Sequence, residues 1–326
     1  MEKTFRSYAE VKHWRDKQIV RVKFDHVQLN RFHDELIQHV YRIASAKVQR
    51  EKGFPPSSFA FFLMGSGGRF EQALISDQDH GMVYSEKSKQ AAAYFQHLGE
   101  EVSLGLEAVG YLRCDGGVMS SNPKWCKSVE EWEEQLKGWM REDCLSSIRE
   151  LLIFCDARVI IGEKNVLLKL KRLLLEDLKK NNGYLLCRML ENTMHVPKVI
   201  GPIGQFLPET HGVHAGAINI KQTAFFTYVN SVRLLALKEG IVETPTIERL
   251  ERLSEKRAYG YRMNSYKASF QQLLAFRLQS EAIDYDSMHY LSLDKLTKTE
   301  KIELKQIIKE GIRLFKFAKR VIEEGC

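Results

Sequence analysis

A glycine-rich turn followed by two nearly adjacent aspartates constrains the fold of this chain more than any other feature. An apolar stretch, Phe59 to Met64, leads into the turn and predicts a buried strand. Asp77 and Asp79 come before a second apolar stretch, Gly81 to Tyr84, which predicts another strand. Side chains two residues apart in a strand point the same way, so both carboxylates should face one point in space. The turn contains Gly65, Ser66, Gly67 and Gly68.

The turn has the composition of a phosphate-binding loop. Its glycines let the backbone bend sharply and let a ligand approach the main chain. The residues that follow, Arg69 to Leu74, are predicted to open a helix, whose first N–H groups attract an anion. Arg69 can hold a phosphate through two hydrogen bonds or pair with a surface carboxylate, and Glu71 can orient it. Glycine turns are also common without a ligand. The residues predicted to bind phosphates are Gly65, Ser66, Gly67, Gly68 and Arg69.

The two carboxylates predict a metal site. Adjacent carboxylates repel each other unless a cation lies between them. Their hard oxygen ligands suit Mg²⁺, or Mn²⁺, which binds protein carboxylates together with substrate phosphates. We therefore predict Asp77 and Asp79 as both the metal ligands and the catalytic residues. An Asp-x-Asp pair on its own is also a frequent surface feature, so the prediction depends on its position after the glycine turn.

Together these motifs resemble those of the polymerase-β-like nucleotidyltransferases, in which Gly-Ser is followed by Asp-x-Asp. The longer pattern, Gly-Ser-x-Gly-Arg-x-Glu and then Ser-Asp-x-Asp, is similar to that of a nucleotidyltransferase family related to the N-terminal domain of PII-protein uridylyltransferase. It corresponds here to residues 65–71 and 76–79. The resemblance extends over most of the chain, through residues 116–119, 122–125, 156–158, 216–221 and 233–237.

The resemblance implies a fold and a reaction. The expected fold is α/β (α+β), with a small mixed-sheet nucleotidyltransferase domain and a C-terminal helical bundle that binds substrate. The expected reaction is metal-dependent transfer of a nucleotidyl group from a nucleoside triphosphate. The acceptor would be a protein, as in PII-protein uridylyltransferase, or a small molecule. The alternative is a catalytically inactive module that senses nucleotide and regulates a partner in signal transduction.

Further site residues are open to more than one interpretation. The resemblance implies a third catalytic carboxylate from a neighbouring strand, for which Asp115 and Asp156 are candidates. Asp115 is more typical of a turn residue, and Asp156 of a structural pair with Arg158. Lys221, in the helical part of the chain, is predicted to bind the nucleotide but is also compatible with a solvated helix charge.

The sequence also predicts how the chain is divided. Residues 1–52 are expected to form a helical lead-in, because apolar residues such as Leu29, Phe32 and Leu36 recur at helical spacing before a break rich in glycine and proline. The nucleotidyltransferase domain is expected over 53–162 and the helical substrate-binding domain over 163–326.

Composition excludes some classes of function. The net charge of +7 is a mild excess, and no dense basic block favours nucleic acid as a substrate. No apolar run predicts a membrane span and no leader is evident, so we expect a cytoplasmic protein. The six cysteines contain no C-x-x-C pair, so they do not predict a zinc site and are expected to be free thiols.

Overall fold

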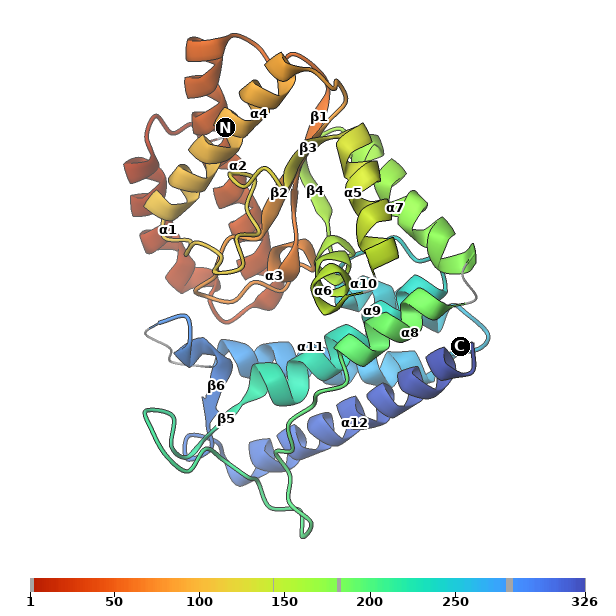
Figure 1. Ribbon diagram of the computed structural model, residues 1–326. Coiled ribbons are helices and arrows are strands. Elements are labelled where there is room, and N and C mark those ends of the chain that lie inside the picture. The colour runs from red at the N-terminus through yellow and green to blue at the C-terminus, as the bar shows by residue number, and fades with distance from the viewer. Residues whose placement is uncertain (1–2, 143, 181–182, 280–283, 326) are drawn as a thin grey trace. The chain divides into compact units, whose positions relative to one another are not determined.

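The computed structural model describes residues 3–142, 144–180, 183–279 and 284–325 (Figure 1). The chain forms two compact units, Met1–Leu174 (unit 1) and Leu175–Cys326 (unit 2), and each is described by itself. Among the described residues, no helix is both long enough and apolar enough to cross a membrane.

Unit 1 is built around a four-stranded mixed sheet with the strand order β3-β2-β1-β4. The central strand β1 pairs antiparallel with both β2 and β4, whereas β2 and β3 are parallel. The sheet confirms the predicted α/β class with a short mixed sheet. The strands are β1 (Phe59–Leu63), β2 (His80–Tyr84), β3 (Cys126–Ser128) and β4 (Arg158–Gly162).

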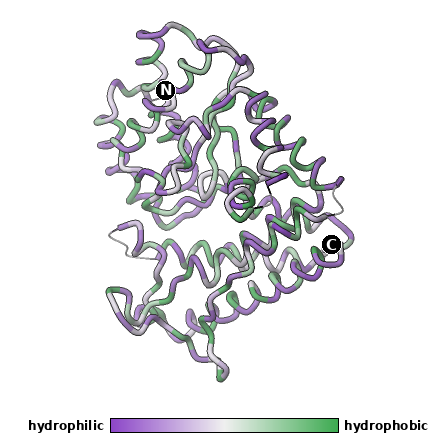
Figure 2. Tube along the Cα trace, in the orientation of Figure 1, coloured by the Kyte–Doolittle hydropathy of each residue, from purple (hydrophilic) through white to green (hydrophobic). Residues whose placement is uncertain are grey.

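Helices cover both faces of this sheet because the side chains of β1 alternate between the faces. Phe61 packs against Tyr41 of α2, and the adjacent Phe62 packs against Trp132 of α5, with ring centroids 5.4 Å and 5.9 Å apart. Figure 2 shows the strands as mainly apolar stretches, whereas the helices alternate between apolar and polar residues. One face carries α1 (Tyr8–Val22), α2 (His26–Lys52) and α4 (Lys89–Ala108), and the other carries α5 (Val129–Glu142) and α6 (Leu145–Phe154).

Unit 2 is mainly helical, and α7 (Lys164–Lys180) leads into it from unit 1. The helix α9 is buried on nearly every side, packed against α8, α10 and α12. A two-stranded antiparallel ribbon of β5 and β6 accompanies the helices. The elements are α8 (Tyr184–Asn192), β5 (Ala217–Asn219), the π-helix η1 (Lys221–Phe225), α9 (Phe226–Lys238), α10 (Thr246–Ser254), α11 (Arg262–Leu278), the 3₁₀-helix η2 (Ser287–His289), β6 (Tyr290–Ser292) and α12 (Lys298–Glu323).

The cysteines differ in part from the expectation. Cys187 is disulfide-bonded, which corrects the prediction of a free thiol at that position. Cys326 lies outside the described residues. Among the described residues, the cysteines outside a disulfide are Cys114, Cys126, Cys144 and Cys155.

Candidate active site

The glycine turn lies at the end of β1, as the sequence predicts, but the helix is formed differently. The glycines themselves make the single helical turn α3 (Gly65–Gly68). The residues after it, where the sequence predicts a helix from Arg69 to Leu74, form an irregular loop. Phe70 adopts a left-handed φ of 60°, which ends the helical turn and directs the chain away from it. The prediction of a helix over 69–74 is therefore wrong, because the helical turn α3 ends at Gly68 and the chain then leaves the helical conformation.

The glycines are required for close approach. A side chain at Gly65, where φ is +51°, would place its Cβ 2.1 Å from Oδ2 of Asp79. A side chain at Gly68 would place its Cβ 1.9 Å from the carbonyl oxygen of Asp156. Gly67 and Gly68 are buried, and the Gly68 N–H donates to the Met64 carbonyl at 2.8 Å. The accessible part of the turn is consequently Gly65 and Ser66, which are half-buried.

Arg69 lies in a buried ion-pair network directly after the glycine turn. Its side chain is only 7% exposed and lies between two buried carboxylates, with Nε donating to Glu71 at 2.6 Å and Nη1 donating to Asp156 at 2.7 Å. Burial alone would lower the pKa of Arg69, but the two carboxylates raise it, so the guanidinium remains charged. The ion-pair alternative is therefore observed, although the partners are buried rather than at the surface, and phosphate binding by Arg69 stays a prediction. Glu71 orients Arg69 as expected.

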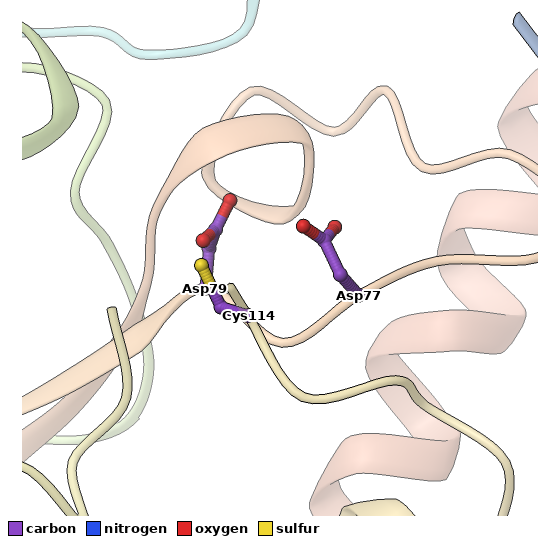
Figure 3. A group of neighbouring side chains, drawn as sticks. All are labelled: Asp77, Asp79 and Cys114. Carbon is purple, nitrogen blue, oxygen red and sulfur yellow. The ribbon is translucent and has the colours of Figure 1, made fainter. Parts of the chain in front are cut away.

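Asp77 and Asp79 converge as the strand alternation predicts. Both are half-buried, whereas Ser76, Gln78 and His80, which come before, between and after them, are buried. Potential ligand atoms of Asp77, Asp79 and Cys114 all lie within 4.8 Å of one another. Figure 3 shows both carboxylates beside the single helical turn α3, with the Cys114 sulfur next to Asp79. Two carboxylates at this separation fit a divalent cation, because each supplies the hard oxygen ligands that Mg²⁺ and Mn²⁺ prefer.

Neither candidate for the third carboxylate lies in this cluster. Asp115 is exposed in a turn. Asp156 is buried and pairs with Arg69, not with Arg158 as expected, since Arg158 makes a two-pronged pair with Asp34 at 2.8 and 2.9 Å. The third member of the cluster is Cys114, which the sequence analysis did not single out. Burial and the Asp79 carboxylate raise the pKa of its thiol to about 12.

Buried polar residues of α2 hold the loop that joins the turn to the aspartates. Asn30 Oδ1 accepts from the Gln72 N–H at 2.7 Å, and its Nδ2 donates to the Gln72 carbonyl at 3.2 Å. His33 Nε2 bonds the Ala73 carbonyl at 2.9 Å, and its Nδ1 bonds the Tyr111 hydroxyl at 2.7 Å. Sequence reasoning missed both residues. The available signal was two polar side chains on the apolar face of a long helix, since buried polar groups require partners.

His80 faces away from the aspartates, as the alternation predicts, and is buried. Its Nδ1 accepts the Ser120 N–H at 3.1 Å, so the ring proton is on Nε2 and donates to Gln78 Oε1 at 3.1 Å. Burial lowers the pKa of His80 to about 3 and that of His33 to about 4. Both imidazoles are therefore neutral near neutral pH and act as fixed hydrogen-bonding groups beneath the site.

Lys221 lies in unit 2, at the start of η1. Its Nζ is 2.9 Å from His289 Nε2 and 5.3 Å from the ring centroid of Tyr285. Burial, together with the nearby charges of Lys221 and Arg277, lowers the pKa of His289 to about 3. This imidazole is therefore neutral, and its Nε2 can accept a hydrogen bond from the Lys221 ammonium group. The prediction that Lys221 binds nucleotide stays a prediction.

Comparison with known families matches both parts of the chain. The family model described as "Putative nucleotidyltransferase DUF294" matches residues 13–144, which include the glycine turn, both aspartates and Cys114. The model described as "Putative nucleotidyltransferase substrate binding domain" matches residues 183–322, which include Lys221. No curated protein matches the chain.

Proposed function

Because the chain belongs to the DUF294 family of putative nucleotidyltransferases, we propose that it transfers a nucleotidyl group from a nucleoside triphosphate to an acceptor hydroxyl. One observation carries the proposal: the carboxylates of Asp77 and Asp79 converge beside the accessible glycine turn. In the transfer, the acceptor oxygen forms a new bond to the α-phosphorus. The bond from that phosphorus to the bridging oxygen breaks, pyrophosphate leaves, and the acceptor proton passes to solvent.

In this proposal, one set of residues in unit 1 binds the metal and another binds the phosphates. Asp77 and Asp79 would hold Mg²⁺ or Mn²⁺, which when bound offsets the phosphate charge and activates the acceptor oxygen. The N–H groups that open a helical turn have no partner inside that turn, so those of Gly65 and Ser66 can bind a phosphate oxygen. Arg69 acts indirectly by fixing the loop between the turn and the aspartates through Glu71 and Asp156.

The acceptor follows from the resemblance rather than from the geometry. We propose a hydroxyl on a protein, as in PII-protein uridylyltransferase, or on a small molecule, with the reaction in the cytoplasm. Lys221 lies within the matched substrate-binding region, and we propose that its cationic head binds the anionic substrate. A Lys221→Gln variant should then raise the KM for the nucleotide with a smaller effect on kcat.

A regulatory module that binds nucleotide without transferring it is the second candidate. The observation that favours it is the absence of a third carboxylate from the described cluster, where Cys114 stands instead. A module of this kind would bind a nucleoside triphosphate and release no pyrophosphate.

The test is a metal-dependent transfer assay with each of the labelled nucleoside triphosphates, offered with a lysate and with small hydroxyl compounds as acceptors. We expect incorporation of label and release of pyrophosphate in Mg²⁺ or Mn²⁺, and background levels for Asp77→Asn/Asp79→Asn. Asp115→Asn is the matched control, because Asp115 is an exposed carboxylate on the neighbouring segment. Transfer that survives the double substitution would contradict the proposal, and nucleotide binding without pyrophosphate release would establish the regulatory alternative.

A further inference from the structure

Cys114 reaches the carboxylate pair because its segment runs parallel to the aspartate segment. The Gln78 N–H donates to the Leu112 carbonyl at 2.9 Å, and the Leu112 N–H donates to the Ser76 carbonyl at 3.2 Å. These two bonds form a parallel bridge between Asp77 and Leu112. Asp79 lies two residues after Asp77, and Cys114 lies two residues after Leu112. Side-chain alternation places both on the same face as Asp77.

Cys114 therefore lies where a third metal ligand would be expected, beside Asp77 and Asp79. Its sulfur and one oxygen from each aspartate all lie within 4.8 Å of one another, so one ion could contact all three. In the described part of the chain, this is the one group of three or more potential ligand residues close enough to hold a metal. The neighbouring carboxylate of Asp115 is exposed in a turn, outside this cluster.

A sulfur ligand changes which metals a site prefers. Oxygen-only sites favour Mg²⁺ and Mn²⁺, whereas a thiolate favours softer ions such as Zn²⁺ and Co²⁺. Catalytic sites for these ions commonly use three protein ligands and keep another position for water or substrate. Asp77, Asp79 and Cys114 supply three ligands, and Gly65 and Ser66 of the glycine turn beside them are half-buried rather than buried.

We propose that Cys114 is the third metal ligand, and that it makes the site bind divalent ions of the Zn²⁺ and Co²⁺ class more tightly than Mg²⁺. This inference rests on the proposed function in one respect, since it takes Asp77 and Asp79 as metal ligands. It adds the identity of the third ligand and the class of ion that the protein selects.

Titration of the full chain with Co²⁺ tests the proposal without an activity assay. Bound Co²⁺ should show the near-ultraviolet charge-transfer absorption of a cobalt–thiolate bond. Cys114→Ser should lose this band and bind Zn²⁺ about 10-fold or more weakly, a loss of at least about 1.4 kcal/mol. Cys114→Asp should also lose the band but bind Mg²⁺ more tightly than the native chain, because it restores an all-oxygen site.

The control is Cys144→Ser. Cys144 is an exposed free thiol whose pKa is lowered to about 7 by hydrogen bonds with Ser146 and Ser147, so it is a competing metal-binding sulfur at the surface. Its removal should leave the band and the Zn²⁺ affinity unchanged. A band that persists in Cys114→Ser, or one that is lost in Cys144→Ser, would overturn the assignment.

The outcomes also separate this inference from the proposed function. In one outcome, the protein shows a cobalt–thiolate band that depends on Cys114 and on both aspartates, yet transfers no nucleotide. That result supports the metal-ligand inference and contradicts the proposed nucleotidyltransferase activity. Transfer that depends on the aspartates, in a protein whose bound Co²⁺ shows no thiolate band, supports the enzyme and overturns the inference. Urea unfolding of each variant would show whether a lost band reflects a lost ligand or a lost fold.

Discussion

The backbone of Gly65 lies directly against the carboxylate of Asp79, with so little space that a Cβ at position 65 would stand 2.1 Å from Oδ2. This contact joins the glycine turn to the metal-binding pair. The turn and the aspartates are therefore one site rather than two neighbouring motifs, because moving either one displaces the other.

A Gly65→Ala substitution should disable the site. The methyl group would push Asp79 away from Asp77, and alanine at a φ of +51° adds strain of about 1 kcal/mol. We expect weaker binding of Mn²⁺, by about 10-fold or more, measured by its electron paramagnetic resonance signal. Gly138→Ala is the control, since Gly138 lies in α5 with no atom within 4 Å of its would-be Cβ. Unchanged Mn²⁺ binding in Gly65→Ala would show that Asp79 is not a ligand.

Replacing Arg69 by methionine should destabilise unit 1 rather than simply weaken nucleotide binding. The substitution leaves the buried carboxylates of Glu71 and Asp156 without their common cation, which costs about 3–5 kcal/mol. Urea unfolding followed by tryptophan fluorescence measures the loss. Arg113→Met removes an exposed pair with Glu107 and should change stability by less than about 1 kcal/mol. A stable Arg69→Met protein with weak nucleotide affinity would support the phosphate-binding role.

The hydrogen bonds from Asn30 should hold the loop before the aspartates. Asn30→Ala leaves the Gln72 N–H without its acceptor, and a buried unsatisfied group of this kind costs about 1–3 kcal/mol. We expect lower stability in urea and faster amide hydrogen exchange at Gln72 and Ala73. Gln28→Ala on the exposed first turn of α2 is the comparison, where only a bond to the Asp25 side chain is lost. Unaltered exchange at Gln72 in Asn30→Ala would contradict this role.

Unit 1 should lose stability in mild acid because of His33 and His80. Their folded-state pKa values, about 4 and about 3, lie below the ordinary value, so the unfolded chain takes up protons first as pH falls. Their contribution is complete above the ordinary histidine pKa and decreases as pH falls towards the folded-state values. Between about pH 7.5 and about pH 5, each should cost about 2 kcal/mol of unfolding free energy.

The measurement is the free energy of unfolding in urea at both pH values. His80→Gln should remove about half of the pH-dependent loss, because one of the two buried imidazoles is then absent. An equal pH dependence in native and His80→Gln proteins would show that this imidazole takes up its proton as readily in the folded as in the unfolded chain.

Local patterns were enough to predict the strand, the turn and the direction of the aspartates. Alternation in β2 and the segment before it requires Asp77 and Asp79 to share a face, and the structure confirms this. Two capping boxes are equally local: Thr297 and Glu300 bond each other's backbone N–H groups at the start of α12, as Ser128 and Glu131 do before α5. In each case, the interacting residues are at most a few positions apart.

The sequence by itself therefore determined the place of the glycine turn and the convergence of two carboxylates, because backbone periodicity fixes where near neighbours point, and its resemblance to a known family implied the class of fold. Only the tertiary structure decided that Arg69 pairs with Asp156, 87 residues away. It also decided that Cys114, brought in by a parallel bridge, joins the aspartates. Contacts of this kind depend on how the elements pack, and no local pattern of residues records that packing.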